Sequence, residues 1–461
     1  MESPKPELTS RCHVVALPYP GRGHINPMMN LCKLLCSKSP DILITFVVTE
    51  EWFSFISSEN KPANVRFRTI PNVIPSELVR AKDFPAFIVA VLTKMEAPFE
   101  ELLDRLELPA KAIIVDTYMA WTVEVGKRRN IPVASLWTMS ASVLSIFLNF
   151  NLLVENQHFP ADLSEQGNEL VDYIPGLTPI HLADLPTIFY GNGLQTLHLA
   201  LDCVSSVPKA QYLLFTSVYE LEFQVIDAFK AKLPFPVYAI GPSIPYLDLK
   251  EISSTTNNPD GPDYFQWLDL QPKGSVLYVS LGSFLSVSAA QMDEIVAGVQ
   301  ESGVRYLWVS RGDSSRFKDC YGGQGLVISW SDQLRVLCHS SVGGFWTHCG
   351  WNSTLEAIYA GVPMLTFPIF WDQIPNSKQI LEDWKIGCRV KKNKVGEHLV
   401  MREEIAELVR KFMDFESNDG KEMRRRARKV QETCQTAIAK GGSSDLNLDS
   451  FIKDISERHT H

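Results

Sequence analysis

The chain has 461 residues, of which 45% are hydrophobic and 21% charged, so it can bury a large core and lacks the composition of a disordered protein. Its formal net charge of −9 argues against a nucleic-acid partner, which needs a positively charged surface. Residues 1–10 lack the apolar core of a signal peptide, and no stretch approaches the roughly 20 apolar residues of a membrane-spanning helix, so we expect a cytoplasmic protein.

The first half of the chain alternates short apolar runs with helix-length segments. Because the runs are continuously apolar, they predict parallel strands buried on both faces of a doubly wound α/β sheet. Helices are expected at Asn26–Cys36 and within Phe84–Leu106. The expected strands are Cys12–Leu17, Ile42–Val48, Val65–Ile70, Ala112–Asp116 and Val133–Leu136.

A polar, turn-rich stretch at residues 242–262 predicts a linker. Beyond it the alternation restarts, with a helix expected at Ala289–Glu301. The pattern therefore predicts two doubly wound domains, residues 1–241 and 263–440, with the ligand at the carboxyl ends of the strands and in the cleft between the domains. The expected strands of the second domain are Ser275–Leu281, Arg305–Ser310, Gly325–Trp330 and Met364–Phe367.

The segment Trp330–Gln373 contains the strongest functional pattern. A short strand, Gly343–Thr347, leads into the turn His348–Gly350, and a helix then opens near Asn352. A glycine turn before a helix N-terminus presents unpaired backbone N–H groups and the positive end of the helix dipole. This arrangement suits a diphosphate.

Each part of this segment also has a structural interpretation, which the pattern alone leaves open. Ser353-x-x-Glu356 is a formal capping box that would merely start a helix. Trp330 and Trp351 would be core aromatic residues, and Asp372-Gln373 would be an ordinary helix start.

The letters HCGWNSTLE, GVPM and DQ begin at residues 348, 361 and 372. They closely resemble the 44-residue donor-binding signature of plant family 1 UDP-glycosyltransferases. The letters PYPGRGHINP from residue 18 are also similar to that family, and the resemblance extends over most of the chain, more loosely in the first half. It implies a GT-B architecture, with two Rossmann-like domains facing across a cleft, and a C-terminal helix within residues 441–461 that returns to the N-terminal domain.

The resemblance assigns the uridine contacts to three residues of the signature. Trp330 would stack on the uracil ring, Gln333 would lie beside the ribose, and Glu356 would accept hydrogen bonds from the ribose hydroxyls. Ser331-Asp332 depart from the usual Ala-Pro of the family, and this places an extra carboxylate beside the expected uracil contact.

The resemblance also assigns the remaining donor contacts. The identities of Gln373 and Trp351 go with glucose donors in the family, so UDP-glucose is the expected donor, and UDP-galactose, UDP-xylose and UDP-glucuronate remain alternatives. Thr138 is expected to contact the sugar or phosphate, with plain packing as the alternative. The diphosphate contacts would be His348, Asn352, Ser353 and Ser283, and the sugar contacts would be Asp372, Gln373, Trp351 and Thr138.

His24 and Asp116 are the expected catalytic pair. His24 follows the first strand in a glycine-rich turn and Asp116 ends the fourth, so both lie at the carboxyl edge of one sheet. A histidine in such a turn is structural as often as catalytic, and the resemblance marks His24 as the general base and Asp116 as the carboxylate that orients it. A neutral imidazole can take the proton of an attacking hydroxyl at pH 7. The implied reaction is one in-line displacement with inversion at the anomeric carbon.

Three other classes of function are weighed against the transferase. A catalytically silent UDP-sugar-binding protein would be favoured by loss of His24 or Asp116, and both are present. A Ser-His-Asp hydrolase would need a G-x-S-x-G turn, which does not occur. A dehydrogenase would need a full G-x-G-x-x-G, and Asn26 occupies the third glycine position.

The acceptor is expected to be a small apolar metabolite bearing a hydroxyl or carboxyl group. Aromatic and aliphatic loops near Phe84–Val91, Phe147–Phe159 and Phe189–Leu199 would bind it, and flavonoids, other phenolics, terpenoid alcohols and hormones all remain open. Neither a cofactor nor a metal is expected, because there is no D-x-D or His/Cys cluster. Members of the family are usually monomers, so the resemblance implies a monomer.

Overall fold

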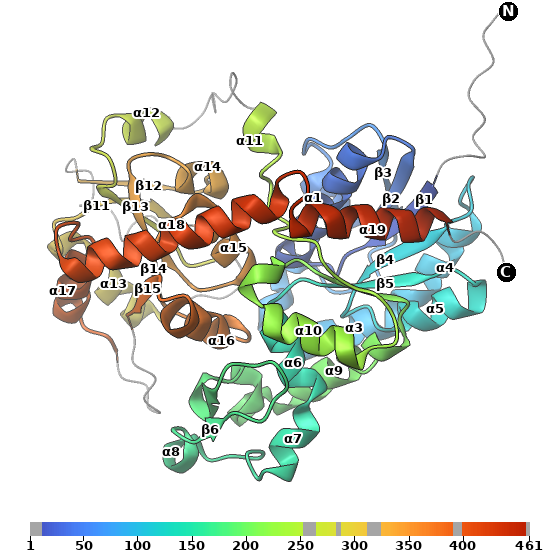
Figure 1. Cartoon of the computed structure of the whole chain (residues 1–461), viewed down its shortest axis with the longest axis horizontal. Helices are drawn as coiled ribbons and strands as arrows, with labels where there is room; N and C mark the ends of the chain where they lie inside the picture. Colours follow the sequence, from blue (N-terminus) through green and yellow to red (C-terminus); the bar gives the residue numbers. More distant parts are fainter. Residues whose placement is uncertain (1–11, 252–263, 283–286, 311–323, 391–398, 458–461) are drawn as a thin grey trace, which may run out of the picture. The chain divides into compact units, whose positions relative to one another are not determined.

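The computed structural model describes residues 12–251, 264–282, 287–310, 324–390 and 399–457. Contacts within the chain divide it into two compact units (Figure 1). Unit 1 comprises Met1–Phe150, Asn192–Ile244 and Ala437–His461, and unit 2 comprises Asn151–Gly191 and Pro245–Thr436.

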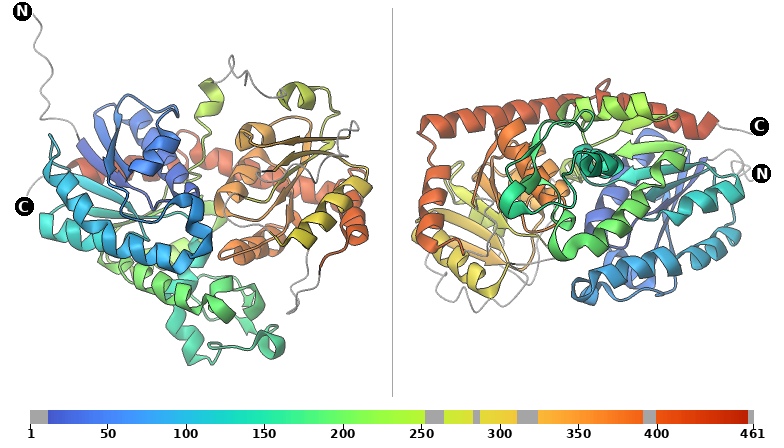
Figure 2. Two further views of the ribbon diagram at one scale, coloured as in Figure 1. Left: turned by 180° about the vertical axis from the view of Figure 1, so that it is seen from behind. Right: turned by 90° about the horizontal axis from the view of Figure 1, so that it is seen from below.

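Unit 1 is built on a seven-stranded sheet with the strand order β3-β2-β1-β4-β5-β8-β9, in which every pairing is parallel. Every residue of β1, β2, β4 and β5 is buried, as the continuous apolar runs predicted. Figure 2 shows the red helix α19 along one side of these strands and blue and cyan helices on the other. The strands are β1 Cys12–Leu17, β2 Ile42–Thr49, β3 Val65–Ile70, β4 Ala112–Asp116, β5 Val133–Trp137, β8 Tyr212–Phe215 and β9 Val237–Ala239.

The helices of unit 1 begin and end close to the predicted positions, with two differences. The predicted helix at Asn26–Cys36 begins four residues earlier, so His24 lies in the first turn of α1 and not in a preceding turn. The predicted run Phe84–Leu106 is two helices that meet at Met95. The main helices are α1 Arg22–Lys38, α2 Glu50–Ile56, α3 Phe84–Lys94, α4 Glu96–Asp104, α5 Trp121–Arg129, α6 Ala141–Leu148, α9 Leu194–Val204, α10 Phe223–Lys232 and α19 Ser443–Glu457, with the short 3-10 helix η2 at Glu77–Lys82.

Unit 2 contains a second parallel sheet, of six strands in the order β12-β11-β10-β13-β14-β15. A core that includes Trp346 and Phe412 packs between this sheet and its helices. The strands are β10 Val276–Ser280, β11 Arg305–Val309, β12 Gly325–Ile328, β13 Val342–Thr347, β14 Met364–Thr366 and β15 Gly387–Arg389. The helices are α13 Ala289–Glu301, α14 Gln333–Leu337, α15 Trp351–Ala360, α16 Gln373–Lys378, α17 Arg402–Phe412 and α18 Asn418–Ile438.

The two units differ from the predicted domains at residues 151–191 and at the start of the C-terminal segment. Residues 151–191 fall in unit 2, although the prediction placed them in the domain 1–241. This segment contains α7 Phe150–Glu155, α8 Leu163–Gln166, the strands β6 Leu170–Val171 and β7 Ile180–His181, and the 3-10 helices η3 Leu182–Asp184 and η4 Thr187–Phe189. Of the predicted linker 242–262, residues 252–262 lie outside the described residues.

The C-terminal segment belongs to unit 1 from Ala437 onward, four residues earlier than the predicted boundary at 441. Helix α19 packs against α1 and β9. Its Asn447 amide donates to the carbonyl of Ala239 at 2.8 Å, and Lys38 pairs with both Asp445 and Asp449. These contacts tie the end of the chain to the first sheet. Among the described residues, no helix is both long and apolar enough to span a membrane.

Candidate functional site

The first candidate group lies at the carboxyl edge of the unit 1 sheet. Strands β1 and β4 are parallel neighbours, so the residues that follow them emerge at the same edge. His24, in the first turn of α1, thereby meets Asp116, the last residue of β4, and its Nδ1 lies 2.7 Å from Asp116 Oδ2. The second carboxylate oxygen accepts the backbone N–H of Tyr118 at 3.0 Å. The predicted catalytic pair is therefore in hydrogen-bond contact.

The surroundings of His24 determine which ring nitrogen can act. With the Nδ1 proton directed at the buried Asp116 carboxylate, the basic lone pair is on Nε2. The side chain of His24 is 23% exposed, so a small molecule can reach it. Thr138, the predicted sugar contact, places its hydroxyl 3.0 Å from His24 Nδ1 and so lies beside the pair. Its contact with a sugar stays a prediction.

Arg80, which the sequence analysis did not single out, holds the loop that leads to His24. Its Nη1 donates to the carbonyl of Pro20 at 3.2 Å and pairs with Glu77 at 3.1 Å. A Cβ atom on Gly21 would lie 2.3 Å from this nitrogen, so the loop needs glycine there to make the contact. A single buried arginine in a short 3-10 helix has no motif or spacing that would have revealed it.

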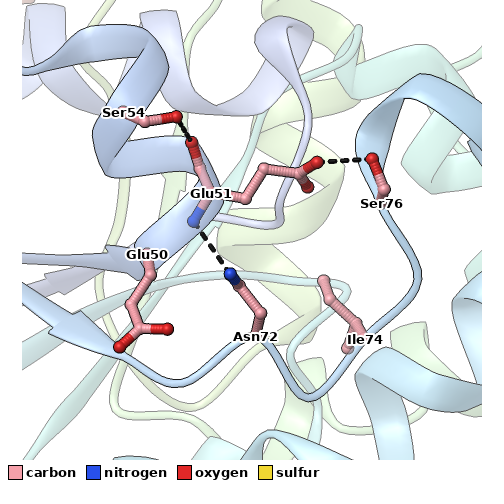
Figure 3. Close-up of a pocket in the computed structure, with 6 residues that line it drawn as sticks. All are labelled: Glu50, Glu51, Ser54, Asn72, Ile74 and Ser76. Carbon is pink, nitrogen blue, oxygen red and sulfur yellow. Dashed lines mark hydrogen bonds between the residues drawn. The ribbon is translucent and has the colours of Figure 1, made fainter.

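A pocket of about 420 Å³ is lined by the start of α2 and by the loop that runs from β3 to η2, the helix that carries Arg80 (Figure 3). Glu51 at the start of α2 accepts the Ser76 hydroxyl and the backbone N–H of Glu77, and its own backbone N–H donates to Asn72. These contacts bind the loop after β3 to α2. Since Glu51 is engaged by neighbouring protein groups, we assign this pocket a supporting role and no ligand.

The second candidate group lies in unit 2, where β13 leads through a glycine turn into α15. Gly350 is the N-cap residue, and Asn352 and Ser353 lie in the first helical turn. Gly350 has no side chain and so makes no capping hydrogen bond of its own. The capping-box interpretation is therefore wrong, because Ser353 lies inside the helix instead of preceding it. The N–H groups at the start of a helix suit an anion, and their contact with a diphosphate stays a prediction.

His348, just before this helix, is enclosed by two glycines. A Cβ atom on Gly282 would lie 2.8 Å from His348 Nε2, and one on Gly350 would lie 2.5 Å away, so both positions need glycine for the imidazole to fit. Burial lowers the pKa of His348 to about 4, against a smaller opposing contribution from the backbone of Ser280. The ring is therefore neutral at pH 7. Its buried Nδ1 has no hydrogen-bond partner within the described parts of the chain, which fits a position that a ligand completes.

Gln333 joins the predicted ribose and phosphate residues into one network. Its amide nitrogen donates to Ser353 Oγ at 2.9 Å and to Glu356 Oε2 at 2.5 Å. Its amide oxygen accepts the Tyr278 hydroxyl at 3.3 Å. Burial raises the pKa of Glu356 to about 7, and the hydrogen bond from Gln333 opposes this increase. Tyr278, from β10, was not identified from the sequence.

The departure at Ser331-Asp332 is accommodated within the protein. The Ser331 hydroxyl lies 2.8 Å from the Tyr278 hydroxyl. Asp332 is the N-cap of α14, where its carboxylate accepts the N–H of Arg335 at 3.2 Å. Its own N–H donates to Tyr264, which proline in this position could not do. The extra carboxylate is thus occupied as a helix cap.

The two predicted aromatic contacts lie in different environments. Trp330 is 62% exposed, which contradicts the core interpretation and leaves its ring face available for stacking. Trp351 is buried and packs near Trp384, with the ring centroids 6.2 Å apart. Core packing therefore accounts for Trp351 as well as a sugar pocket does.

The predicted sugar-binding pair is held in one orientation by its neighbours. Gln373 Oε1 accepts the backbone N–H groups of Ile369 and Phe370 at 2.8 and 2.9 Å, so the NH₂ group is the end of the amide that remains for a ligand. Asp372 precedes α16 without a side-chain capping hydrogen bond, and its carboxylate accepts the Asn376 amide at 2.7 Å. The interpretation of Asp372-Gln373 as a helix start is correct, since Asp372 is the N-cap residue of α16 and Gln373 its first residue. A contact of the pair with a sugar stays a prediction. Ser283, the last predicted phosphate contact, lies outside the described residues.

The described residues include no cluster of three or more His, Cys, Asp or Glu side chains able to hold a metal ion. The predicted contacts of unit 2 are instead backbone N–H groups, amides, a neutral imidazole and carboxylates. These groups suit an organic anion with hydroxyl groups, because N–H groups bind phosphate and carboxylates accept from hydroxyls.

Comparisons with known proteins agree with this chemistry. Residues 47–397 match the family described as UDP-glucoronosyl and UDP-glucosyl transferase. UDP-glycosyltransferase 87A2 of Arabidopsis thaliana is 58% identical over 445 residues, which cover 96% of this chain and 96% of that protein. UGT2 of Phytolacca americana, solved with UDP-2-fluoro-glucose and pterostilbene, is 28% identical with a TM-score of 0.80 and covers 96% of this chain and 100% of its own. A UDP-glucosyltransferase of Polygonum tinctorium capable of glucosylating indoxyl, solved with 3,4-dichloroaniline, is 27% identical with a TM-score of 0.82, at 97% and 99% coverage.

The raised pKa of Glu356 predicts a pH dependence of donor binding. Near pH 7 the carboxyl is about half ionised, and the ionised form accepts hydroxyl hydrogen bonds better. The affinity for UDP-glucose should therefore rise by up to roughly tenfold between pH 6 and pH 8, measured by calorimetry. UDP-glucose is the suitable probe because it lacks the phosphate ionisation near pH 6 that a terminal phosphate has.

The control variant is Glu356→Gln, which keeps the shape and cannot ionise. It should show a weaker and nearly flat affinity over this range, while His24→Ala should keep the slope. A flat profile for the unmodified protein, or an equal slope in Glu356→Gln, would contradict the assignment of Glu356.

Proposed function

The chain belongs to the UDP-glucoronosyl and UDP-glucosyl transferase family and is a glycosyltransferase, and we propose that it moves glucose from UDP-glucose onto a hydroxyl or carboxyl group of a small apolar metabolite. Its two doubly wound units are the Rossmann-like domains of the GT-B architecture. The observation that carries the proposal is the contact between His24 and the buried Asp116, which supplies a general base that a mere binding protein does not need.

The donor assignment rests on the groups that unit 2 presents. Trp330 offers an exposed ring to the uracil, and Glu356 offers a carboxylate to the ribose. The open N-terminus of α15 offers N–H groups to the diphosphate. For the sugar, Gln373 presents its NH₂ group as a donor. The Asp372 carboxylate, which also accepts from Asn376, presents oxygens that can accept hydrogen bonds from sugar hydroxyls. Glucose is chosen as the sugar because of Gln373, and because the donor analogue bound to the Phytolacca americana protein is a glucose derivative.

The mechanism is one displacement. His24 Nε2 takes the proton of the acceptor as its oxygen attacks the anomeric carbon, and Asp116 stabilises the imidazolium that forms. The bond from the anomeric carbon to the UDP oxygen breaks on the opposite face, so the α-linked donor becomes a β-glycoside. His348 is neutral, so it supplies no positive charge to the departing UDP. In the proposed mechanism the negative charge on UDP is stabilised by N–H dipoles, from the backbone at the start of α15 and from the imidazole of His348. No metal step is part of the proposal.

The acceptor class is inferred from the ligands of solved relatives, and aromatic residues surround the base. The ring of Tyr19 lies 5.0 Å from His24, and the rings of Phe87 and Tyr118 lie 6.1 and 6.0 Å from that of Tyr19. Phe87 belongs to α3, within the predicted acceptor segment Phe84–Val91. These rings are buried and pack against one another, so they support the base. The preference for an aromatic acceptor rests on the pterostilbene and dichloroaniline bound to the two solved relatives.

The first experiment measures UDP release from UDP-glucose with a panel of phenols, aliphatic alcohols and carboxylic acids. We expect release that depends on an acceptor and is fastest with phenols. The glycoside formed should show the β-anomeric coupling by NMR. Binding of UDP-glucose without turnover of any acceptor would favour a silent binding protein, and failure to bind UDP-glucose would overturn the donor assignment.

The second experiment tests the base. His24→Ala and Asp116→Asn should each lower kcat by about 10²- to 10⁴-fold, because general-base catalysis supplies a factor of this size. The KM for UDP-glucose should change little, since unit 2 presents the donor contacts. Asp227→Asn is the matched control, because Asp227 is an exposed carboxylate of α10 in the same unit and lies outside the segments expected to bind the acceptor. An unchanged kcat in His24→Ala would remove His24 from the mechanism.

A further inference from the structure

Residues 178–187 contact the α16 region of unit 2 at several points. Lys378, at the end of α16, donates to the Thr178 hydroxyl at 2.6 Å and to Asp383 at 2.7 Å. Arg389 of β15 pairs with Asp184 at 3.3 Å. These polar links bind a segment far away in the sequence to the helix that follows the sugar-binding pair.

The contact nearest to the proposed sugar site is a reciprocal pair of hydrogen bonds. The backbone N–H of Trp371 donates to Thr187 Oγ1 at 2.7 Å, and the backbone N–H of Thr187 donates to the carbonyl of Trp371 at 3.2 Å. One residue of η4 thus satisfies both backbone groups of Trp371.

Trp371 needs such support because of its backbone conformation. Its φ is +57°, in the left-handed region that residues other than glycine disfavour. A conformation of this kind persists when surrounding contacts hold it. Trp371 immediately precedes Asp372 and Gln373, so its dihedral angles determine the direction in which both side chains leave the chain.

We propose that Thr187 is a positioning residue for sugar recognition: it holds Trp371 in the left-handed conformation and thereby orients Asp372 and Gln373 toward the donor sugar. This inference rests on the proposed function, in which Asp372 and Gln373 bind the sugar. Thr187 acts through Trp371 and is assigned no contact with the donor itself.

The remaining contacts of the pair show why one hydroxyl has this effect. Gln373 is held by the N–H groups of Ile369 and Phe370, and Asp372 by Asn376, all within a few residues of the pair. Asn376 also donates to the carbonyl of Cys349 at 3.0 Å, which ties the Asp372 end of the loop to the turn before α15. None of these bonds holds the backbone of Trp371. Thr187 lies 184 residues away in sequence and links the loop to the rest of unit 2.

The test compares Thr187→Val with Thr187→Ser and Thr178→Val in the full-length protein. Thr187→Val keeps the shape and the backbone N–H but removes the oxygen that accepts from Trp371. Thr187→Ser restores that oxygen. Thr178→Val removes a hydroxyl from the same segment at the contact with Lys378, away from Trp371, and is the matched control.

The first measurement is the affinity for UDP and for UDP-glucose by calorimetry. In Thr187→Val we expect UDP to bind within about twofold of the unmodified protein, and UDP-glucose to bind about 3- to 10-fold more weakly, as for one lost hydrogen bond. Thr187→Ser and Thr178→Val should keep the original ratio of the two affinities. An unchanged ratio in Thr187→Val, or an equal loss for both ligands, would overturn the proposal.

The second measurement separates this inference from the donor proposal. Hydrogen exchange at the Trp371 amide should accelerate in Thr187→Val and not in Thr178→Val, whether or not a sugar binds. Unchanged exchange would disprove the support of Trp371 by Thr187. The affinity for UDP-glucose is also measured in Asp372→Ala and Gln373→Ala. If exchange accelerates in Thr187→Val but neither of these variants changes the affinity, the pair is not the sugar site, and the role given to Thr187 in recognition is overturned.

Discussion

The proposed catalysis depends on a hydrogen bond of 2.7 Å between His24 and Asp116, and several contacts of unit 1 maintain it. Asp116 is 1% exposed, so its charge has lost most of its hydration and relies on its two partners, the His24 ring and the Tyr118 N–H. The parallel pairing of β1 with β4 brings the two residues to one edge, and Arg80 holds the Pro20 carbonyl just before α1 begins. The base is thus placed by the sheet and kept in place by a buried cation.

The two histidines of the proposed reaction differ in their surroundings, and these surroundings determine which role each can have. His24 is partly exposed and has a carboxylate partner, which stabilises the positive charge that a general base acquires. His348 is enclosed between Gly282 and Gly350, and burial lowers its pKa to about 4. An imidazole that stays neutral can donate an N–H to a diphosphate without competing for the proton. In the proposed reaction, histidine therefore has two roles: His24 is the base in unit 1, and His348 is a neutral N–H donor in unit 2.

The sequence predicted the sheets well, because continuous apolar runs identify buried parallel strands. The expected bounds of β1, β3 and β4 coincide with the observed ones. The start of α1 was misplaced: a helix was expected from Asn26, whereas it begins at Arg22 and contains Pro27 in its second turn. Residues 151–191 were assigned by their order in the chain, but the side-chain contacts of Thr178, Asp184 and Thr187 place them with unit 2.

Most of the proposed donor residues could be singled out because they lie in one segment in which a strand, a turn and a helix follow one another. Their role as donor contacts stays a prediction. The residues that orient them could not be predicted. Tyr278 reaches Gln333 from β10, and Thr187 reaches Trp371 from η4, each through a single hydroxyl that has no periodicity or fixed spacing. A change at such a hydroxyl leaves the donor signature intact while it alters the orientation of Gln333 or Gln373. Under the proposed role of Thr187, proteins with the same signature are expected to differ in donor affinity where these distant hydroxyls differ, and comparison of the signature alone would not account for that difference.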